Sequence, residues 1–268
     1  MTHFFVSAEQ VQEGTVEITG PDFNHLKNVL RMKPGEKLSV SVGESTAGKP
    51  VGGAPFDGGK AQEAANPRKK YLCEVREFTE DAAALTILSE TAGDSELPVE
   101  ITLFQGIPKG DKLENIIQKS VELGASAIVP VAMKRCVAKI EPKKEEARLK
   151  RYEAISEAAA KQSKRDRIPT VGPVMNLKEA VMSCKDYEHI FVPYEDALNM
   201  AETRAAFETV RPGERVAVFI GPEGGFEPSE VAEITAAGGK SVTLGKRILR
   251  TETAGPAVLA MLVYLLEP

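Results

Sequence analysis

The pattern of hydrophobic and polar positions changes character near residue 95. In the first ninety residues, short stretches alternate apolar and polar side chains, as strands do when one face of a sheet is buried and the other is exposed. From residue 99 onward, continuous apolar runs alternate with longer helical stretches, which is typical of βαβ units whose sheet is covered on both faces. The pattern predicts an antiparallel sheet or small barrel followed by an α/β domain with a parallel sheet.

The amino-terminal region is predicted to hold four strands and one helix. The strands are TVEI (15–18), KLSVSV (37–42), YLCEVREF (71–78) and ALTILSE (84–90), and the helix covers residues 22–31. Residues from about 44 to 70 are rich in Gly, Pro and Ala and show no periodicity, which indicates a flexible surface loop or an inserted hairpin.

The second region is predicted to alternate five strands with six helices. The strands are 100–107, 127–133, 189–194, 216–221 and 241–245, and the helices are 110–123, 145–163, 176–184, 198–209, 228–237 and 252–266. Turn-forming residues cluster at 91–98, so we expect the domain boundary there, with domains at 1–92 and 97–268.

Composition limits the class of protein without identifying it. The 268 residues are 42% hydrophobic and 27% charged, which is ordinary for a globular chain. Cys73, Cys136 and Cys184 share no short spacing, so neither a disulfide framework nor a zinc site is predicted. The amino terminus does not read as a secretion signal, and the longest apolar run is too short to span a bilayer. We therefore expect a cytoplasmic protein that uses no metal and no membrane.

Charge is distributed unevenly along the chain. The formal net charge of −5 argues mildly against bulk nucleic-acid binding, but residues 134–167 hold twelve Lys and Arg against six Asp and Glu. A solvated helix face with i to i+4 ion pairs explains residues 142–151 equally well. The cluster KQSKRDR (161–167) has only one acid and favours a surface that faces RNA.

Several common catalytic motifs are excluded by the residues present. GESTAGKP (43–50) has the spacing of a phosphate-binding loop, but Pro50 replaces the hydroxyl residue that would hold magnesium. No GxGxxG turn is present. His3, His25 and His189 have no nearby partner for nucleophilic catalysis, and we expect His189 to be a structural residue at the start of a buried strand.

The most informative segment runs from Gly221 to Ala254, where two polar turns each leave an apolar strand and enter a helix. Glycines in GPEGGF let the backbone approach a ligand closely, and Glu223 places a carboxylate beside them. In the second turn, Ile248 and Leu249 form an apolar lip between basic residues. Because parallel strands end at the same edge of a sheet, we expect the two turns to hold a ligand between them.

GPEGGF followed by LGKRILRTETA resembles the signature of the SPOUT class of RNA methyltransferases, and in particular the RsmE family, which methylates N3 of uridine 1498 in bacterial 16S ribosomal RNA. The resemblance covers nearly the whole chain, except for the insertion at about 44–70 and a Cys at 136 where the family more often has Ser. Other matching segments are HFFV (3–6), HLKNVLRMKPGEKLSV (25–40), KGDKLENIIQKSVELGASAIVPV (109–131) and EAAAKQSKRDRIPTV (157–171).

The resemblance implies a PUA-like β-barrel joined to a SPOUT-type α/β domain with a carboxyl-terminal trefoil knot. It also implies a homodimer, a last helix that packs against the partner copy, and S-adenosylmethionine bound by the turns at 192–196, 221–226 and 244–251. The implied cofactor-binding residues are Val192, Pro193, Ile220, Gly221, Gly224, Gly225, Leu244, Gly245, Ile248 and Leu249.

The same resemblance suggests roles for polar residues. Uracil N3 must lose a proton before it attacks a methyl group, so Glu252 or Glu223 is the candidate base, and Arg250 or Arg165 would stabilise the uracil anion. The base must also be unpaired or flipped out, since N3 lies on its pairing edge. The candidate RNA-binding residues are Arg31, Lys33, Arg135, Lys161, Lys164 and Arg165, with plain surface charge as the alternative.

Two other functions stay open at this point. The first is a SPOUT methyltransferase that acts on another RNA site, although such relatives lack the stretch HLKNVLRMKPGEKL. The second is a non-catalytic factor that binds the small ribosomal subunit (30S) or assists its assembly. Affinity for S-adenosylmethionine separates the enzymes from the binding factor.

Overall fold

The computed structural model describes residues 1–43, 69–138, 142–194 and 199–267. Contacts between residues divide the chain into two compact units. Unit 1 contains the described residues of 1–52 and 61–96 together with Ala160–Ile168, and unit 2 contains those of Leu97–Ala159 and Pro169–Pro268. The segment 160–168, which the sequence analysis assigned to the second domain, therefore packs with the first unit. The insertion predicted at about 44–70 lies almost entirely outside the described residues.

Unit 1 is built on a six-stranded sheet with the order β1-β4-β5-β6-β3-β2. Four of the five strand pairs are antiparallel, as the alternating pattern predicted. The pair β1 and β4 is parallel, and β1 and β2 were not predicted as strands. The strands are β1 (His3–Val6), β2 (Val11–Gln12), β3 (Thr15–Thr19), β4 (Lys37–Val42), β5 (Lys69–Phe78) and β6 (Ala82–Ala92), and a 3-10 turn, η1, covers Ala8–Gln10.

The helix predicted at 22–31 is shorter and less regular than expected. It consists of α1 (Gly20–Asn24) followed directly by a π-helical turn, η2 (His25–Val29). Arg31 follows with φ of 52°, a left-handed conformation that is uncommon outside glycine and that a helix cannot continue through. Leu26 is fully buried in the core of unit 1, whereas Val29 is 61% exposed.

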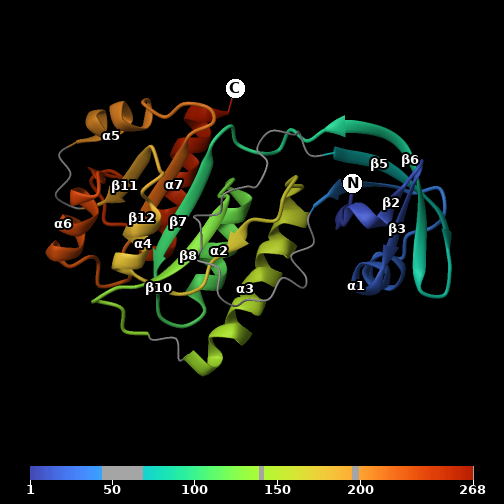
Figure 1. The fold of residues 1–268 in the computed structure, drawn as a ribbon, viewed down its shortest axis with the longest axis horizontal. Coiled ribbons are helices and arrows are strands. Elements are labelled where there is room, and N and C mark those ends of the chain that lie inside the picture. Colours follow the sequence, from blue (N-terminus) through green and yellow to red (C-terminus); the bar gives the residue numbers. More distant parts are fainter. Residues whose placement is uncertain (44–68, 139–141, 195–198, 268) are drawn as a thin grey trace. The chain divides into compact units, whose positions relative to one another are not determined.

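Unit 2 contains a seven-stranded sheet in which every strand pair is parallel. The order is β10-β8-β7-β12-β11-β13, and β9 also pairs with β8 (Figure 1). The strands are β7 (Glu100–Gly106), β8 (Ala127–Ala132), β9 (Thr170–Val171), β10 (Met175–Asn176), β11 (His189–Pro193), β12 (Arg215–Ile220) and β13 (Lys240–Val242). The predicted parallel α/β class is confirmed, and β9 and β10 are the strands that the sequence analysis missed.

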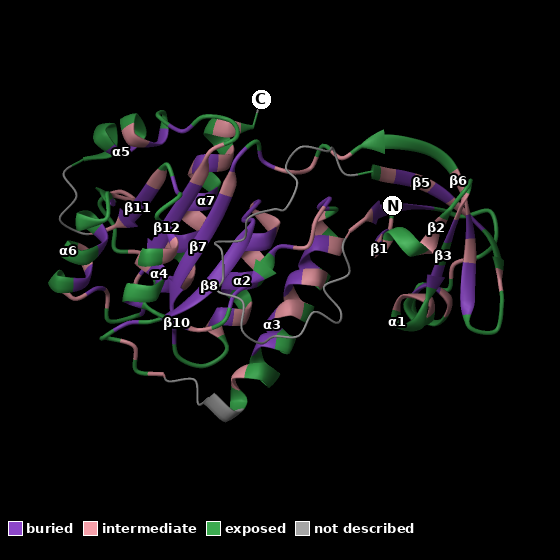
Figure 2. Cartoon of the chain, in the orientation of Figure 1, coloured by how far each residue is buried: buried purple, intermediate pink, exposed green. Residues whose placement is uncertain are grey.

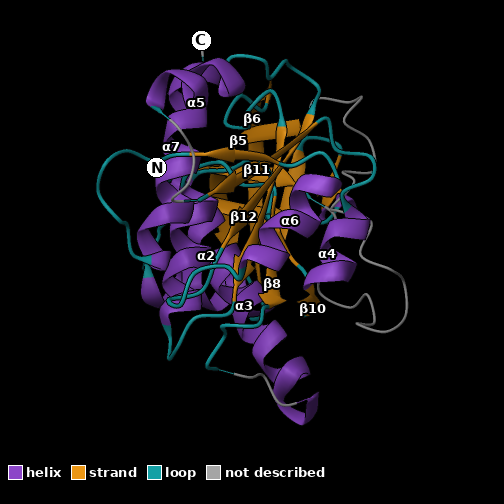
Figure 3. Cartoon of the chain, turned by 90° about the vertical axis from the view of Figure 1, so that its left-hand side faces the viewer, coloured by secondary structure: helices purple, strands orange, loops and turns teal. Residues whose placement is uncertain are grey.

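Helices cover both faces of this sheet. Helices α2 and α7 lie on one face and α4 and α6 on the other (Figure 3). The strands between them are buried almost throughout (Figure 2), which explains their continuous apolar sequence. Phe104 and Phe219 stack at 4.6 Å within the core. The helices are α2 (Lys112–Glu122), α3 (Pro142–Ser163), α4 (Leu177–Ser183), α5 (Met200–Phe207), α6 (Pro228–Ala236) and α7 (Thr251–Leu266).

Within the described ranges, no helix is both long enough and apolar enough to cross a membrane. His189 at the start of β11 is satisfied structurally, because its Nε2 lies 2.8 Å from an Oε atom of Glu214. This contact confirms the structural role that the sequence analysis gave to His189.

Candidate active site

The two turns singled out from the sequence leave neighbouring parts of one sheet edge. Strand β11 lies between β12 and β13, and all three strands are parallel, so their carboxyl ends point to the same side. The turn at 221–227 follows β12, and the turn at 243–250 follows β13 and leads directly into α7. The turn after β11 is described only as far as Tyr194. This edge is where parallel α/β sheets bind ligands.

Glycine is required where the backbone segments of this edge approach closely. A Cβ atom at Gly106 would lie 2.6 Å from the backbone nitrogen of Pro222, so the end of β7 and the turn after β12 touch through their main chains. Gly245 has φ of +107°, a conformation that other residues rarely adopt. Gly106 lets the two main chains touch, whereas Gly245 is required only for its backbone conformation, since a Cβ there would meet nothing within 4 Å.

A buried hydrogen-bond chain ties the two turns to each other. The hydroxyl of Thr251, the first residue of α7, donates to the carbonyl of Gly221 at 2.6 Å. Gln105 at the end of β7 donates from Nε2 to Thr251 Oγ1 at 2.8 Å. Gln105 is fully buried and its Oε1 has no hydrogen-bond partner. The chain fixes the start of α7 against the end of β12.

The residues predicted to bind a cofactor differ in what they offer. Val192 and Ile220 are buried in the sheet, so only their backbone groups remain available. Ile248 is 93% exposed, and a side chain this apolar gains from being covered by a ligand or a second protein surface. Pro193, Gly221, Gly225, Leu244, Gly245 and Leu249 are half-buried, and Gly224 is exposed. Backbone polar groups beside apolar side chains are the kinds of group that line small-molecule sites.

Two of the three predicted catalytic residues are brought together by a lysine. Lys112 Nζ lies 2.9 Å from Glu223 Oε1 and 3.4 Å from Glu252 Oε2, and we call these three residues the Lys112 triad. Glu223 also accepts the backbone N–H of Lys109 at 3.1 Å. The triad joins the first turn of α2, the turn after β12 and the first turn of α7. Lys112 was not among the residues predicted to act at this site.

The charges in the Lys112 triad support one another. Partial burial opposes ionisation of Glu223, but hydrogen bonds from Lys112 and from backbone N–H groups outweigh it and hold the pKa of Glu223 below its ordinary value. The pKa of Lys112 is raised by Glu223 first and by Glu252 in addition. Lys112 is therefore a cation at neutral pH. Arg250, the third predicted catalytic residue, is exposed at the N-cap position of α7.

Arg135, predicted to contact RNA, is attached to the first turn instead of projecting freely. Its Nε donates to Glu227 Oε1 at 2.7 Å, and its Nη1 donates to the carbonyl of Gly224 at 3.0 Å. A Cβ at Gly224 would lie 3.0 Å from Arg135 Cβ, so the glycine makes room for this contact. Arg135 nevertheless remains an exposed residue and can face a ligand across the turn.

The basic residues predicted to bind RNA in unit 1 fall into two groups. Arg31, Lys33 and Lys164 are exposed, and Lys164 has φ of 59° at the end of α3. Lys161 lies 2.6 Å from Asp22 and above the ring of Phe4. The first group is available to an external phosphate, whereas Lys161 already has an internal partner.

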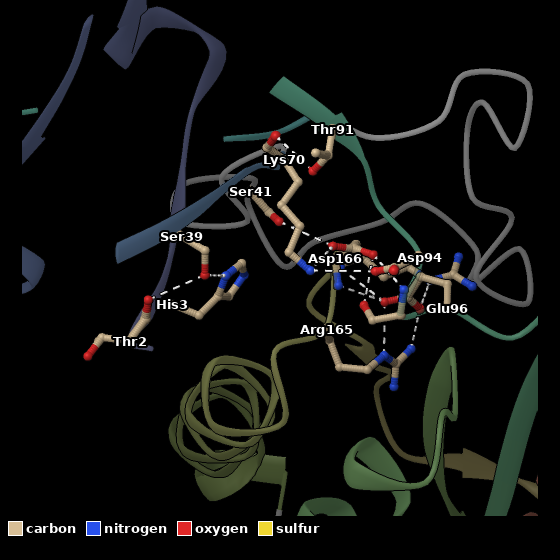
Figure 4. Close-up of polar contacts among 12 residues, drawn as sticks. Thr2, His3, Ser39, Ser41, Lys70, Thr91, Asp94, Glu96, Arg165 and Asp166 are labelled. Atoms are coloured by element: carbon tan, nitrogen blue, oxygen red, sulfur yellow. Dashed lines mark hydrogen bonds and ion pairs between the residues drawn. The ribbon is translucent and has the colours of Figure 1, made fainter. Parts of the chain in front are cut away.

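Arg165 is buried, with only 3% of its side chain exposed, and belongs to a network of ion pairs (Figure 4). It donates to both carboxylate oxygens of Glu96, at 2.9 Å and 2.5 Å. Glu96 also accepts from Arg167 and from two backbone N–H groups. Asp166 beside it accepts from Ser95 and pairs with Lys70 at 3.2 Å. We call this network the Glu96 cluster; its members are Ser41, Lys70, Ser95, Glu96, Arg165, Asp166 and Arg167.

The Glu96 cluster explains why segment 160–168 packs with unit 1. Burial alone would raise the pKa of Glu96, but the hydrogen bonds and charges of Arg165 and Arg167 lower it to about 2. Nearby, burial lowers the pKa of His3 to about 4, and its Nδ1 lies 2.8 Å from Ser39 Oγ. The guanidinium of Arg165 is committed to Glu96, so Arg165 is not among the residues that we propose contact RNA.

Residues 142–151 behave as a solvated helix face. Lys150 pairs with Glu146 at 2.8 Å one turn away, and Arg151 pairs with Glu114 of α2. In the part of the chain that the structure describes, no three His, Cys, Asp or Glu side chains are grouped as a metal site would require.

Family models match both units. A model of an RNA methyltransferase domain matches residues 95–263, and a model of an RNA methyltransferase PUA domain matches residues 18–49. The parallel α/β domain is therefore an RNA methyltransferase domain. The PUA match confirms the family assigned to the amino-terminal region.

Individual relatives narrow the family. The ribosomal RNA small subunit methyltransferase E of Bacillus subtilis is 32% identical, over 100% of this chain and 98% of its own length. A protein of the same name from Synechocystis is 30% identical over 98% of this chain and 77% of its own. The solved structure of such an enzyme from Neisseria gonorrhoeae, bound to S-adenosyl methionine, has a TM-score of 0.76 and 31% identity, covering 99% of this chain and 98% of that one. The chain belongs to the ribosomal RNA small subunit methyltransferase E (RsmE) family.

Proposed function

We propose that this protein methylates N3 of uridine 1498 in 16S ribosomal RNA of the small subunit, with S-adenosylmethionine as the methyl donor. The observation that carries the proposal is the Lys112 triad, which places two carboxylates next to the ligand-binding turns of an RsmE-family fold. The relative from Neisseria gonorrhoeae binds S-adenosyl methionine in a similar fold. We expect the reaction to take place in the cytoplasm, where ribosomal subunits are assembled.

The residues at the sheet edge fit this cofactor. Leu244, Ile248 and Leu249 provide an apolar slot for the adenine ring, and the peptide groups of Gly221 and its neighbours provide hydrogen bonds to its edge. When bound, S-adenosylmethionine supplies an already activated methyl group. The protein has to place the nucleophile in line with that methyl group and exclude water.

The proposed chemistry uses the carboxylates and Arg250. Glu252 or Glu223 removes the proton from N3 of uracil, and Arg250 stabilises the negative charge that develops on the uracil oxygens. Arg250 and Glu252 lie at the first turn of α7, which the hydrogen bond from Thr251 to Gly221 fixes against the cofactor turn. Both side chains are therefore presented from a rigid element.

For RNA contacts we retain the residues that keep accessible charge. Arg31, Lys33 and Lys164 are exposed in unit 1, and Arg135 is exposed in unit 2. Lys161 makes at most an indirect contribution, since it pairs with Asp22. Phosphate contacts of this kind position RNA without reading its sequence. Neutralising one of them would reduce the salt dependence of binding.

We also propose a trefoil knot at the carboxyl-terminal turns and a homodimer through α7. The outer side of α7 carries Tyr264, which is 85% exposed, and Leu265, which is 37% exposed, and Ile248 lies shortly before the helix. Exposed apolar side chains at this density favour a protein partner. Sedimentation equilibrium of the wild type and of Tyr264→Glu tests the dimer, because a buried charge at a symmetric interface would shift the protein to monomers.

The decisive experiment is mass spectrometry of 16S ribosomal RNA from a strain that lacks the gene. Loss of a single 3-methyluridine, and its return on complementation, would support both the reaction and its position. A modification lost at a different site would favour the alternative SPOUT methyltransferase. No change in modification, together with no calorimetric affinity for S-adenosylmethionine, would favour a binding or assembly factor.

A further inference from the structure

The two carboxylates of the Lys112 triad, Glu223 and Glu252, have different hydrogen-bond donors. Glu223 accepts a 2.9 Å hydrogen bond from Lys112 and a backbone N–H from Lys109, so one of its oxygens is shared between two donors. Glu252 Oε2 lies 3.4 Å from Lys112 Nζ, is buried and accepts no hydrogen bond. A buried carboxylate oxygen without a donor is costly, whereas a fully bonded one is stable. The two acids are therefore suited to different tasks.

The net charge of the Lys112 triad also distinguishes the two carboxylates. The triad contains one ammonium and two carboxylates, so it carries one negative charge in excess. Glu223 has the shorter contact with Lys112 and an extra N–H donor, so Glu252 is the less completely paired carboxylate of the two. A carboxylate that is incompletely compensated gains more from accepting a proton than one held by strong donors. The side chain of Glu252 is also 32% exposed, which leaves it accessible to a ligand.

We propose that Lys112 is a positioning residue that fixes Glu223 as a structural anchor and leaves Glu252 as the group that accepts the N3 proton of uracil. This inference rests on the proposed function and removes the choice between the two acids. Glu223 holds the turn after β12 to the start of α2 through Lys109 and Lys112, and so sets the place of the cofactor turn. Lys112 stays protonated throughout and is not itself the base.

The step balances without any further reactant. The N3–H proton passes to the carboxylate of Glu252, and the electron pair left on N3 forms the bond to the methyl carbon. The bond between that carbon and sulfur breaks, and its electrons stay on sulfur as a neutral thioether. Protonation of Glu252 leaves Lys112 and Glu223 as a neutral ion pair, so the site loses its excess charge. Glu252 then returns its proton to water.

Single-turnover methylation at saturating S-adenosylmethionine tests the division of roles, with unmodified small subunits as substrate. We expect Glu252→Gln to lower the rate on the order of 10²- to 10⁴-fold and to abolish the acid limb of the pH–rate profile. We expect Glu223→Gln to lower the rate less and to keep that limb. A Glu252→Gln enzyme that retains both the rate and the acid limb would overturn the assignment.

Loss of a purely structural residue would not change the pH–rate profile, so this profile tests whether Lys112 positions the two carboxylates. In Lys112→Met we expect the pH–rate profile to change and the rate to fall, because the positive charge between the two carboxylates is removed. Lys112→Arg keeps the charge and should restore most of the wild-type profile. A Lys112→Met enzyme with the wild-type pH profile would overturn the proposal.

A measurement without substrate separates this inference from the proposed function. Hydrogen exchange at the amide of Lys109 reports the contact with Glu223 directly. Exchange should accelerate at least several-fold in Glu223→Ala, which has no acceptor for this N–H, and in Lys112→Met, but not in Glu252→Gln. Unchanged exchange in Glu223→Ala would remove the anchor role. Absence of methylation by the wild type would instead refute the proposed function, and the exchange result would still stand.

Discussion

The two units each contain a group of acidic and basic side chains, but the two groups differ in how completely they are paired. In the Glu96 cluster, Glu96 accepts from two guanidinium groups and two backbone N–H groups, and Arg165 is 3% exposed. In the Lys112 triad, one lysine serves two carboxylates and all three side chains are between 22% and 34% exposed. The residue types are similar, whereas the supply of donors is not.

The number of hydrogen-bond donors available to each carboxylate distinguishes a purely structural ion pair from one that can take part in chemistry. Glu96 has no capacity left to exchange a proton near neutral pH, since its pKa is about 2. Glu252 has a buried oxygen that lacks a donor, and it lies beside a turn that carries an uncovered Ile248. Buried charges with full hydrogen bonding hold a fold together, and partly satisfied ones occur where a ligand completes them.

We expect the largest effect at low pH, where unit 1 should unfold before unit 2. The folded pKa of Glu96 is about 2 against an ordinary 4.5, so its stabilisation is present above pH 4.5 and is lost as pH falls from 4.5 to 2. The folded pKa of His3 is about 4 against an ordinary 6.5. The stabilisation that neutral, buried His3 contributes is therefore present above pH 6.5 and is lost as pH falls from 6.5 to 4. Each group contributes roughly 3 kcal/mol. Hydrogen exchange resolved by peptide as a function of pH measures both units, and simultaneous loss of protection would contradict the prediction.

Arg250→Ala should reduce methylation without changing stability. Removing a single donor to a developing anion costs about 10²- to 10³-fold in rate. Arg250 is exposed, so the unfolding midpoint should stay at the wild-type value. The matched control is Arg247→Ala, an exposed basic residue of the same turn. Equal losses in the two variants would mean that Arg250 acts only through general positive charge.

Glu96→Gln should have the opposite effects to Arg250→Ala: it should lower the stability of the protein and leave the site in unit 2 intact. Glu96→Gln removes the buried carboxylate charge with which Arg165 and Arg167 pair, at a cost of about 3 kcal/mol in the free energy of unfolding. Chemical denaturation with the exposed pair variant Glu146→Gln as control measures the effect. The control should leave the midpoint unchanged. Calorimetric affinity for S-adenosylmethionine should be retained in folded Glu96→Gln protein.

Thr251→Val should show the smallest effect, and on both properties at once. It removes the hydroxyl that joins Gln105 to Gly221, at a cost of about 1 to 3 kcal/mol in the stability of unit 2. Affinity for S-adenosylmethionine should fall as well, because the first turn of α7 is no longer tied to the turn after β12, which we propose binds the cofactor. Thr251→Ser keeps the hydroxyl and should recover most of both. Wild-type affinity in Thr251→Val would show that the two turns are positioned independently.

The order and type of most elements could be predicted from periodicity alone. The strands and helices of unit 2 agree with the predicted ranges to within three residues, because continuous apolar runs and helical spacing are local properties. The short strands β9 and β10 carry too few residues to show a period. The π-helical turn after α1 is also invisible to a pattern based on regular helices.

The site was only partly predictable, because its key contacts join distant residues. Glu223 and Glu252 stood out beside the two turns, but Lys112 reaches them from a helix more than a hundred residues earlier. Gln105 lies within an apolar strand, and the sequence does not show that it is buried and bonded to Thr251. Arg165 was predicted to lie on a basic surface, because its partner, Glu96, lies 69 residues away in the sequence. Local charge counts cannot detect such pairing.

The return of segment 160–168 to unit 1 has a consequence for synthesis of the protein. The chain of unit 1 is interrupted by residues 97–159, so its last part leaves the ribosome only after β7, α2, β8 and most of α3 have been made. Until Arg165 and Arg167 emerge, Glu96 lacks the guanidinium donors that hold it in the finished unit. Closing so long a loop adds an entropic cost to the step. Completion of the amino-terminal unit is therefore expected to await the translation of residue 168.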